Sequence, residues 1–553
     1  MKRILLLTFA ILGLLSIDNT LRAQAPNWTW AKQIADTSSE QGTGIATDSL
    51  GNVYTVGMFS DPSLSIGTAT LTNAGKSDIY ITKYNSAGTV IWAKRIGGSD
   101  SDSPGGIATD KSGNVYIAGG FVSPTLNLGA VTLTNTAGSG FTDIFLAKYD
   151  TNGNLLWAKN SNGTTYAEIS ALCVDAVGNP IVTGHWAVSL TIGSTTLSPV
   201  GTTMNIFAAK FDSNGNSLWA KTSGGSPGTM ILSGANQATG ISSDANGDIY
   251  ISGYTGDTTY TFGTTTYTTN SIEHGFLFKY SASGTPLWAL HIPNNGWVNF
   301  PWAVTTDAAG NSVITGYAAG SSFSIGSATV SNTGNATMFL AKIDAMGNAV
   351  WAKSIGQGAD PRSITSDASG NIFLTGALTS PTISFGSTTL TKMGTLDIFV
   401  AKFDASGNAV WAKNAFATGG YGNGICVDNS GDVYVGGFDS SATFGSTVLN
   451  NVGKYDAFIA KLSGTTGIKE LSLNNNAIVY PNPFTTNAII KFDKNITDAS
   501  IKIYNATGQI VKETNNFNGD NFVLSREGLD AGMHFLQIVS KEEISSPIKI
   551  IVN

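Results

Sequence analysis

The chain has 553 residues, a length that fits three or four domains of about 150 residues or one large all-β architecture. Because 42 % of the residues are hydrophobic and 10 % are aromatic, the composition excludes a disordered chain and predicts a sizeable core. The net charge of −7 provides no basic surface for phosphate backbones or anionic lipids, which excludes nucleic acid as an expected partner.

The first 25 residues have the layout of a cleaved secretory signal. Residues 1–3, Met-Lys-Arg, precede an apolar run over residues 4–15, and the small-residue pattern Ala23-Gln24-Ala25 follows. The apolar run is shorter than the ~20 residues that a membrane-spanning helix needs, and no later stretch reaches that length. We therefore expect cleavage near Ala23 or Ala25, and an exported mature protein without a transmembrane segment.

Between residues 26 and 465 the sequence repeats one unit seven times. Four motifs recur in a fixed order: a Trp-Ala-Lys tripeptide or near match, an Asp-x-x-Gly-[Asn/Asp] turn, a hydrophobic run that ends in Lys, and a Gly that starts a Thr- or Ser-rich run. The tryptophans of the first motif are Trp30, Trp92, Trp157, Trp219, Trp288, Trp351 and Trp411. The aspartates that begin the turns are Asp48, Asp110, Asp175, Asp244, Asp307, Asp367 and Asp428.

Within the first unit the motifs predict four strands, over residues 44–48, 53–57, 78–84 and 90–94. Four antiparallel strands per unit, with a long excursion between the second and the third, are typical of a propeller blade. The motifs are dense in Gly, Thr, Val and Ile and lack a 3.6-residue period, which excludes helical repeats. The predicted fold is therefore all-β, a seven-bladed β-propeller of four-stranded blades.

The order of the motifs predicts how the ring closes. The Trp-Ala-Lys motif occurs first at Trp30, before any Asp turn, whereas the last unit stops at Lys461 after its third strand. We therefore expect the strand over residues 28–32 to be the outer strand of blade 7 and to pair with residues 458–461. This exchange removes the exposed edges that an open array would carry.

Two segments carry a family resemblance. Residues 106–119, Gly-Ile-Ala-Thr-Asp-Lys-Ser-Gly-Asn-Val-Tyr-Ile-Ala-Gly, and residues 142–150, Thr-Asp-Ile-Phe-Leu-Ala-Lys-Tyr-Asp, resemble the SBBP repeats of bacterial seven-bladed propellers. The likeness extends over about residues 27–465. It implies a propeller and secretion or surface display, and the family has no agreed enzymatic activity.

The tail is richer in charge and poorer in Gly than the repeats, so we expect a linker over residues 466–476 and a separate domain over residues 477–553. Alternating patterns over residues 501–504, 535–539 and 548–551 predict the strands of a small Ig-like β-sandwich that folds independently.

This tail resembles the carboxy-terminal sorting domain of type IX secretion substrates in the Bacteroidetes. The motif residues are Pro481, Asn482 and Pro483, the turn that ends at Gly508, and Gly532. One departure is that Met-His-Phe follows Gly532 where the family usually has Gly-[Ile/Val]-Tyr. The resemblance implies the type IX secretion machinery as a partner. It also implies export to the periplasm and then a location on the outer-membrane surface or outside the cell.

No linear motif predicts a catalytic residue, a metal site or a cofactor. Each turn Asp could begin a cation loop, but no Glu follows at the twelfth position, and recurrence in every unit favours a structural turn. The four histidines, His185, His274, His291 and His534, are scattered across different units and the tail, which gives no sequence support for a two-His metal site. The Gly-x-Ser-x-Gly match at residues 224–228 lacks the strand-turn-helix context of a nucleophile elbow.

The two cysteines, Cys173 and Cys426, occupy the same repeat position in blades 3 and 7. These blades lie nearly opposite in a seven-membered ring, whereas a disulfide needs Cα atoms within ~7 Å. We therefore expect two free thiols.

One residue of each unit, five positions before the turn Asp, is expected at the mouth of the axial channel. These residues are Thr43, Gly105, Ser170, Thr239, Trp302, Arg362 and Asn423. Trp302 and Arg362 sit on adjacent blades, with Trp297 and Tyr421 in neighbouring connections, and these four form the predicted ligand site. Aromatic planes beside one cation suit a sugar or a peptide. In the alternative, Trp297 and Trp302 only cover the end of blade 5.

Two functions stay open from the sequence. The favoured one is an exported, non-catalytic binding or adhesion module for carbohydrate or protein. The other is an extracellular polysaccharide hydrolase or lyase with its site at the axial mouth. Two carboxylates roughly 5 to 10 Å apart in the mouth would favour the enzyme, because glycosidases use that separation.

Overall fold

The computed structural model describes residues 25–163, 166–199, 204–225, 236–256, 259–263, 265–268, 274–293, 299–464, 478–505, 509–539 and 548–553. All of the regular elements in these ranges are strands, and none is a helix that could span a membrane. The expected signal at residues 1–25 lies outside the described residues except for Ala25, and so does the expected linker at 466–476. The chain divides into two compact units between Gly464 and Thr465.

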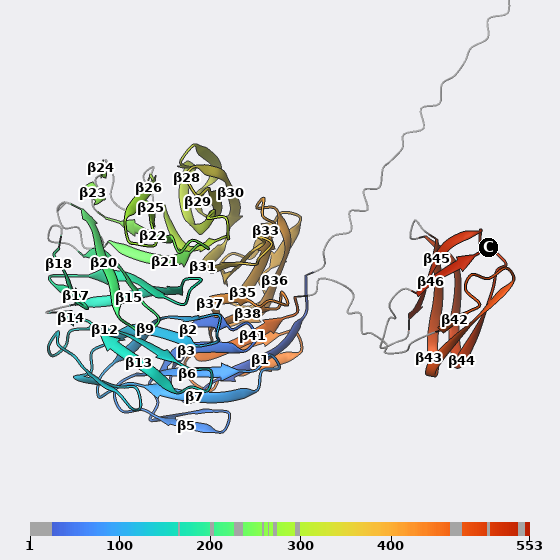
Figure 1. Cartoon of the computed structure of the whole chain (residues 1–553), viewed down its shortest axis with the longest axis horizontal. Coiled ribbons are helices and arrows are strands. Elements are labelled where there is room, and N and C mark those ends of the chain that lie inside the picture. The colour runs from blue at the N-terminus through green and yellow to red at the C-terminus, as the bar shows by residue number, and fades with distance from the viewer. Residues whose placement is uncertain are drawn as a thin grey trace, which may run out of the picture. The chain divides into compact units, whose positions relative to one another are not determined.

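The first unit consists of four-stranded antiparallel blades, each ordered from the axis outward (Figure 1). Blade 1 consists of β2 (Glu40–Thr47), β3 (Val53–Phe59), β6 (Asp78–Tyr84) and β7 (Val90–Ile96), and blade 2 of β8 (Asp102–Thr109), β9 (Val115–Phe121), β12 (Asp143–Tyr149) and β13 (Leu155–Asn160). Blade 3 consists of β15 (Ala167–Val174), β16 (Pro180–Trp186), β19 (Asn205–Phe211) and β20 (Ser217–Gly225), and blade 4 of β21 (Gln237–Ser243), β22 (Ile249–Thr255), β25 (His274–Tyr280) and β26 (Pro286–Ile292). Blade 5 consists of β27 (Phe300–Thr306), β28 (Ser312–Ile325), β29 (Ala328–Ile343) and β30 (Ala349–Gln357), and blade 6 of β31 (Ala359–Ser366), β32 (Ile372–Leu378), β35 (Asp397–Phe403) and β36 (Ala409–Ala417). Blade 7 consists of β37 (Tyr421–Val427), β38 (Val433–Asp439), β41 (Asp456–Leu462) and β1 (Trp28–Ile34).

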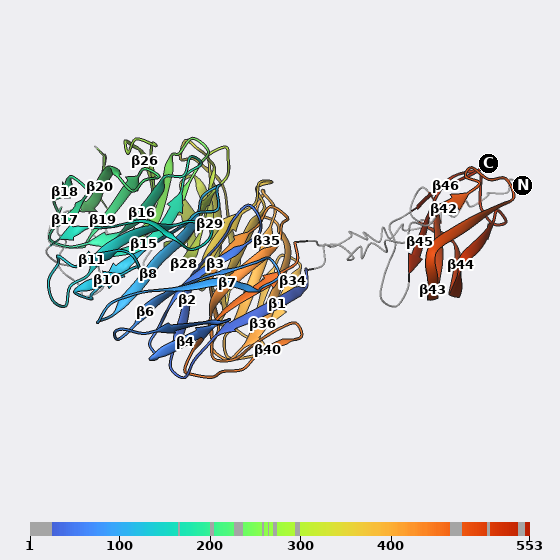
Figure 2. The ribbon, with the colours of Figure 1, turned by 60° about the horizontal axis from the view of Figure 1, so that its bottom comes forward.

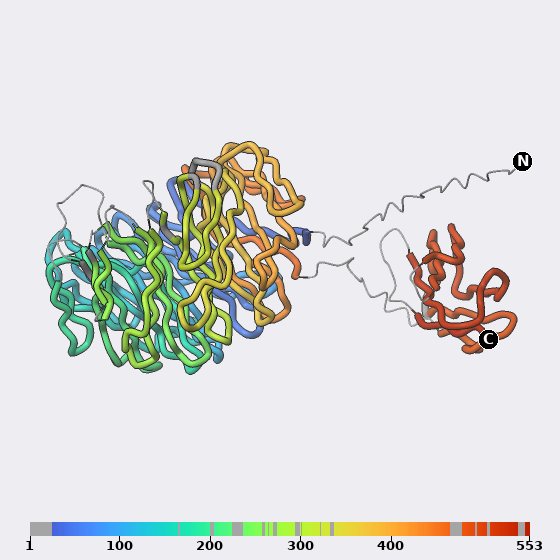
Figure 3. The backbone as a smooth tube through the Cα atoms, turned by 90° about the horizontal axis from the view of Figure 1, so that it is seen from above, coloured from blue at the N-terminus to red at the C-terminus, as the bar shows by residue number. Residues whose placement is uncertain are grey.

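The inner strands form a closed ring. Each of β2, β8, β15, β21, β27 and β31 contacts the inner strand of the next blade, and β37 contacts β2 again. Closure depends on β1, which pairs antiparallel with β41 in the register Trp30 with Lys461 and Ile34 with Ala457. The predicted pairing of residues 28–32 with residues 458–461 is confirmed. In Figure 3 the blue N-terminal segment runs beside the orange strands of blade 7.

The Asp turns between the first and second strands of each blade are self-contained. In blade 1 the Asp48 Oδ1 accepts the backbone N–H groups of Leu50 and Asn52 at 3.0 and 2.9 Å, and Oδ2 accepts the Asn52 amide at 2.8 Å. Gly51 adopts φ +75°, a left-handed conformation that favours Gly. Since the turn itself occupies both carboxylate oxygens, the geometry agrees with the structural interpretation of the motif rather than with a cation loop.

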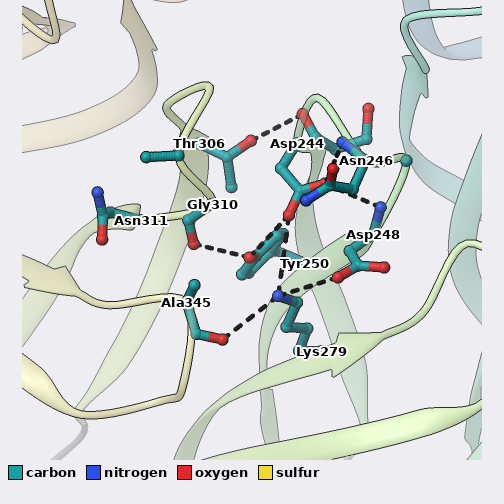
Figure 4. A network of polar contacts seen from close by, with 12 residues as sticks. Asp244, Asn246, Asp248, Tyr250, Lys279, Thr306, Gly310, Asn311 and Ala345 are labelled. Carbon is teal, nitrogen blue, oxygen red and sulfur yellow. Dashed lines mark hydrogen bonds and ion pairs between the residues drawn. The ribbon is translucent and has the colours of Figure 1, made fainter.

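Two side chains of blade 4 reach blade 5, as Figure 4 shows. The Tyr250 hydroxyl donates to the Gly310 carbonyl at 2.7 Å and contacts Asp244 at 3.2 Å. The Lys279 ammonium lies 3.8 Å from Asp244 Oδ2 and donates to the Ala345 carbonyl at 3.3 Å. Because Gly310 and Ala345 belong to turns of blade 5, this network joins the two blades.

The tryptophans of the Trp-Ala-Lys motif, which lie in the fourth strand of each blade, complete the inter-blade contact. The indole Nε1 groups donate to backbone carbonyls in the next blade from Trp30, Trp92, Trp157, Trp219 and Trp288. Trp411 of blade 6 differs, since its Nε1 is buried without a hydrogen-bond partner. The next blade is blade 7. Its third and fourth strands are β41 and β1, which are not consecutive in the chain, so no turn joins them to supply the carbonyl. The recurring Trp is therefore a packing residue between blades.

We expect Lys279→Met to lower the free energy of unfolding by about 2 kcal/mol, because it removes the buried ion pair with Asp244 and the charged hydrogen bond to the Ala345 carbonyl. The Lys279 and Asp244 side chains are 6 % and 1 % exposed. The matched variant Lys342→Met affects a pair with Asp307 that is 14 % and 22 % exposed, so its cost should be about 1 kcal/mol or less. Chemical denaturation of both variants measures the difference, and equal losses would contradict the account of the inter-blade network.

The long excursion between the second and third strands of most blades folds into a small hairpin. These hairpins are β4 (Ser63–Ile66) with β5 (Ala69–Thr72), β10 (Thr125–Asn127) with β11 (Thr132–Thr134), β17 (Leu190–Ile192) with β18 (Thr195–Leu197), β23 (Thr259–Phe262) with β24 (Thr265–Thr268), β33 (Thr382–Phe385) with β34 (Thr388–Thr391), and β39 (Ala442–Phe444) with β40 (Thr447–Leu449). In blade 5 the long β28 and β29 form it directly, and in blade 3 β14 (Asn162–Gly163) pairs with β17. Figure 2 shows β17, β18 and β40 at the outer margin of the unit, where they flank the fourth strands.

The cysteines are free, as predicted. Burial raises the pKa of the Cys173 thiol to about 12, and burial also raises that of Cys426. Because the thiolate is the reactive form, we expect neither thiol to react with a disulfide reagent at pH 8 until the propeller unfolds. Absorbance titration of the native protein tests this, and rapid labelling of either cysteine would contradict it.

The second unit contains β42 (Ile478–Tyr480), β43 (Asn487–Asn505), β44 (Ile510–Ser525), β45 (Gly532–Val539) and β46 (Ile548–Val552). β43 connects both halves of this sheet, because residues 489–491 pair with β42 and residues 500–505 pair with β45. Register shifts between those segments allow the strand to change direction. The buried side chains of this unit form a core of their own that includes Phe484, Ile501 and Leu536.

Candidate functional site

A β-bulge occurs at the same position of every inner strand. The pairing between the first two strands of each blade shifts at one residue, which is left without a direct partner. The seven shifted residues are Thr43, Gly105, Ser170, Thr239, Trp302, Arg362 and Asn423. They are the ring residues expected from the sequence, and a bulge is a feature that re-aims a side chain.

Below this ring the inner strands leave little space between blades. A Cβ added at Gly106 would lie 2.9 Å from Leu172 Cβ, and one at Gly424 would lie 3.0 Å from Ile45 Cγ2. Polar side chains of the ring also join adjacent blades, because Thr239 Oγ1 donates to the Pro301 carbonyl at 2.8 Å and Asn423 Nδ2 to the Gly42 carbonyl at 2.9 Å. The facing surfaces of the inner strands are therefore built from small residues and tightly packed.

Arg362 is the centre of a cluster of aromatic and charged side chains. Its guanidinium carbon lies 5.4 Å from the Trp302 ring centroid and 5.0 Å from the Tyr421 ring centroid. Its Nη2 donates to Asp360 Oδ2 at 2.6 Å, and the Arg362 side chain is 35 % exposed. Burial, with the hydrogen bond and charge of Asp360, raises the pKa of the Tyr317 phenol far above its usual range. The cluster holds one cation between two rings and pairs it with one carboxylate.

The structure thus brings together three of the four predicted ligand residues. Tyr421, expected in a connection, is the first residue of β37. Trp297 lies outside the described residues. Trp302 and Tyr421 are partly exposed, and neither packs against a buried core cluster of the described residues. The tryptophans of the Trp-Ala-Lys motif, in contrast, all pack against such clusters.

Asp360 and Tyr317 were not singled out from the sequence. Asp360 stands two positions before the bulge residue Arg362, and Tyr317 lies in the neighbouring blade. The repeat contains a usable signal, because the position of Asp360 is also the position of Glu168 and Tyr421 in their blades. This second set of side chains lies at the start of the inner strands, beside the bulge.

A second polar cluster occupies the start of blade 3. The Tyr166 hydroxyl donates to Glu168 Oε2, and His185 Nε2 lies 3.6 Å from the same oxygen. The Glu168 side chain is 45 % exposed, whereas His185 is buried. Burial lowers the pKa of His185 despite the nearby carboxylate of Glu168. Sequence distance does not predict this grouping, because cross-strand register places His185 opposite Glu168.

The distribution of histidines differs from the one expected. His274 and His291 both belong to blade 4, and their ring centroids are 5.2 Å apart. The expectation that all four histidines fall in different units was wrong. The antiparallel pairing of β25 with β26 brings His274 and His291 together, although they are 17 positions apart in the sequence. Still, no group of three or more His, Cys, Asp or Glu side chains in the described ranges is arranged to hold a metal ion.

In the second unit the predicted sorting residues have structural roles. The Asn482 amide joins the chain to the last strand, because its Nδ2 donates to the Lys549 carbonyl at 3.0 Å and its Oδ1 accepts the Ile551 N–H at 2.8 Å. Pro481 and Pro483 follow cis peptide bonds on either side of it. Gly532 begins β45 with φ +136°, whereas Gly508 lies outside the described residues.

Family comparisons agree with both resemblances. Residues 478–553 match the secretion system C-terminal sorting domain, and residues 29–58 and 91–119 match the beta-propeller repeat named SBBP. The chain is therefore an all-β propeller-repeat protein with a sorting domain at its carboxy-terminal end. The sorting domain directs the protein out of the cell, to the surface or the medium, and implies the type IX secretion machinery as a partner.

Curated relatives match the chain only in part. It is 23 % identical over 534 residues to an uncharacterized WD repeat-containing protein, L264, of Acanthamoeba polyphaga mimivirus, with 78 % of this chain and 38 % of that protein covered. It is 29 % identical over 170 residues to the regulatory protein FlaEY of Caulobacter vibrioides, with 30 % of this chain and 17 % of that protein covered. The chain thus spans well under half the length of these relatives.

Solved structures that resemble the chain share about 10 % of its sequence. Sqt1 from Chaetomium thermophilum has a TM-score of 0.37 with 78 % of this chain and 100 % of that chain covered. The phage phi92 endosialidase has 0.37 with 94 % and 87 % covered. PorZ, a surface component of the type IX secretion system of Porphyromonas gingivalis, has 0.17 with 93 % and 81 % covered. Likeness at this level carries no information on function.

Proposed function

We propose that this exported propeller is a non-catalytic binding module whose ligand, a carbohydrate in preference to a protein, is held at the axial mouth. The observation that carries the proposal is the Trp302, Arg362 and Tyr421 cluster. These rings are partly exposed, flank a cation and do not pack on the described core. Trp297 is the fourth residue of the proposed site.

Stacking and hydrogen bonding supply the recognition. The apolar face of a sugar gains contact from the flat rings of Trp302 and Tyr421, while the guanidinium of Arg362 donates to ring hydroxyls or carboxylates. A cation between two aromatic planes favours a sugar over an apolar peptide.

The alternative is a polysaccharide hydrolase or lyase, and the blade 3 cluster favours it. Glu168 is exposed and touches Tyr166 and His185, which are side chains able to transfer protons. The other carboxylate at the mouth, Asp360, is 8 % exposed and paired with Arg362, so it offers no free acid or base opposite Glu168. One available carboxylate supports binding better than the two-carboxylate chemistry of a glycosidase.

Incubation of the mature protein with a panel of linear polysaccharides tests the proposal. We expect retention of the protein in gels that contain a bound polysaccharide, with no new reducing ends and no unsaturated products after prolonged incubation. Chain cleavage that Glu168→Gln abolishes would contradict the proposal and establish the enzyme. Absence of retention on every polysaccharide would also contradict it.

A further inference from the structure

A row of aromatic rings continues from the mouth across the end of blade 7. The Tyr421 and Phe438 ring centroids lie 5.5 Å apart, and those of Phe438 and Tyr455 lie 5.4 Å apart. Cations occupy both ends of this row, because Arg362 lies 5.0 Å from the Tyr421 ring and the Lys454 ammonium 5.9 Å from the Tyr455 ring. We call Arg362, Tyr421, Phe438, Tyr455 and Lys454 the blade 7 row.

The rings of the row are not part of the core. Tyr421, Phe438 and Tyr455 are partly exposed, and none packs against a buried hydrophobic cluster of the described residues. The core of blade 7 lies instead on residues such as Phe444 and Phe458. Burial of apolar surface within the protein therefore gives little reason for three aromatic side chains here.

The repeat does not require aromatic residues at these positions either. The residues that correspond to Phe438 in blades 1 to 6 are Met58, Gly120, His185, Tyr254, Tyr317 and Ala377. The residues that correspond to Tyr455, which precede the third strand, are Ser77, Thr142, Met204, Glu273, Ala336 and Leu396. Only blade 7 has an aromatic residue at both positions together with one at Tyr421. The row is thus a local addition to a fold that forms without it.

We propose that the blade 7 row is an extended subsite for a linear glycan whose sugar rings carry carboxylate groups, an inference that rests on the proposed binding function of the mouth. Four successive steps of 5.0 to 5.9 Å separate the groups of the row. The three rings are inclined to one another by 36° and 72°, so they present separate apolar faces and edges to more than one sugar ring. A single sugar bound at Trp302 would leave most of it unused.

The charges of the row select the class of glycan. Lys454 is exposed, and the described residues give its ammonium no ion-pair partner. Arg362 is paired with Asp360 yet remains 35 % exposed. A cation at each end of an aromatic row complements a chain that presents carboxylates at intervals, and a neutral chain would leave Lys454 without an opposite charge.

Affinity electrophoresis of the mature full chain tests the row, with polygalacturonate as the acidic probe and hydroxyethylcellulose as the neutral one. We expect stronger retention on polygalacturonate, weakened by salt. Phe438→Ala and Tyr455→Ala should each lower the affinity about tenfold, the loss expected of an aromatic anchor. Lys454→Gln, on an exposed side chain that folding does not need, should weaken binding to polygalacturonate alone. Met58→Ala, at the matched position of blade 1, should leave retention unchanged.

The outcomes distinguish failure of the blade 7 row from failure of the proposed binding function at the mouth. If Trp302→Ala abolishes retention while the Phe438, Tyr455 and Lys454 variants bind like the wild type, the row is overturned and the mouth stands. Retention on hydroxyethylcellulose equal to that on polygalacturonate would overturn the acidic class of ligand. If neither probe nor any other polysaccharide retains the wild-type protein, the proposed function fails with the row.

Discussion

Deletion of residues 26–34 is expected to unfold or aggregate the propeller, with a loss of stability on the order of 5 kcal/mol. The deleted segment includes β1, whose Trp28, Ala31 and Ile34 are buried in the propeller core. Burying an apolar side chain contributes about 1.5 to 3 kcal/mol, so three of them account for a loss of this order. The edge of β41 would also become free to pair with other chains. Size-exclusion chromatography and thermal unfolding of the deleted protein measure both effects.

Two further variants make this result specific to closure. Ala31→Pro removes one backbone donor from β1 opposite Ala460 and should lower the melting temperature without removing any large side chain. Truncation after Gly464 removes the second unit, which has its own core, and should leave the melting temperature of the propeller nearly unchanged. The same truncation should abolish delivery to the surface. A deleted protein that stays monomeric and melts like the wild type would refute the closure role of β1.

Raising the pH from 6.5 to 9 is expected to lower the free energy of unfolding by about 3 kcal/mol, through carboxyl groups at the junction of blades 7 and 1. Burial, aided by Asp61 and Asp456, raises the pKa of Glu40 to about 8. Burial and the charge of Asp456 raise that of Asp439 to about 7. Both groups therefore hold a proton in the folded state at pH 6.5, whereas the unfolded chain has released it. Stability is present at the lower pH and is lost as the pH rises through these values.

The surroundings of Glu40 and Asp439 explain why these two carboxyl groups stay protonated. Glu40, Asp61, Asp439 and Asp456 are at most 3 % exposed. The Gln33 amide donates to Asp456 at 2.6 Å, and the Asp36 N–H donates to Glu40 at 2.8 Å. Asp61 accepts the Ser38 N–H and the Thr37 hydroxyl. The Tyr80 phenol lies near Glu40. Among the residues that the structure describes, no Lys or Arg forms an ion pair with them.

Chemical denaturation across this pH range measures the effect. The range begins at pH 6.5 because burial lowers the pKa values of His185 and His291, and these groups act on stability below that pH with the opposite sign. The double variant Glu40→Gln with Asp439→Asn should remove most of the pH dependence up to pH 8, above which the raised pKa values of the two thiols add a further loss. Asp36→Asn, a half-exposed neighbour, should preserve it. A flat profile in the wild type, or an unchanged slope in the double variant, would contradict this account.

The sequence predicts most of the propeller because each blade repeats the same local requirements. The Asp turn needs a carboxylate and a Gly at fixed spacing, and the inter-blade contact needs a Trp and a Lys, so seven copies show the same pattern. The position of β1 follows from the order of the motifs alone. The bulge follows less directly, because a single extra residue in the inner strand changes neither the length of the unit nor its pattern of apolar residues.

The candidate site is less predictable because register, rather than sequence distance, assembles it. Tyr421 and Phe438 are 17 positions apart and become neighbours only when β37 pairs with β38. The same holds for Glu168 with His185, and for His274 with His291. Alignment of the repeats by strand position, with a search for side chains that the fold does not require, is the signal that could have found them.

The proposed binding function depends most on whether Trp302 binds a ligand or only covers the end of blade 5. One measurement decides this: the melting temperature and the polysaccharide affinity of the same Trp302→Ala protein. Because the Trp302 ring is partly exposed and does not pack on the described core, we expect a nearly unchanged melting temperature. We expect the binding free energy to fall by about 1 to 3 kcal/mol, as for an aromatic anchor. A large loss of stability with unchanged affinity would contradict the proposed site.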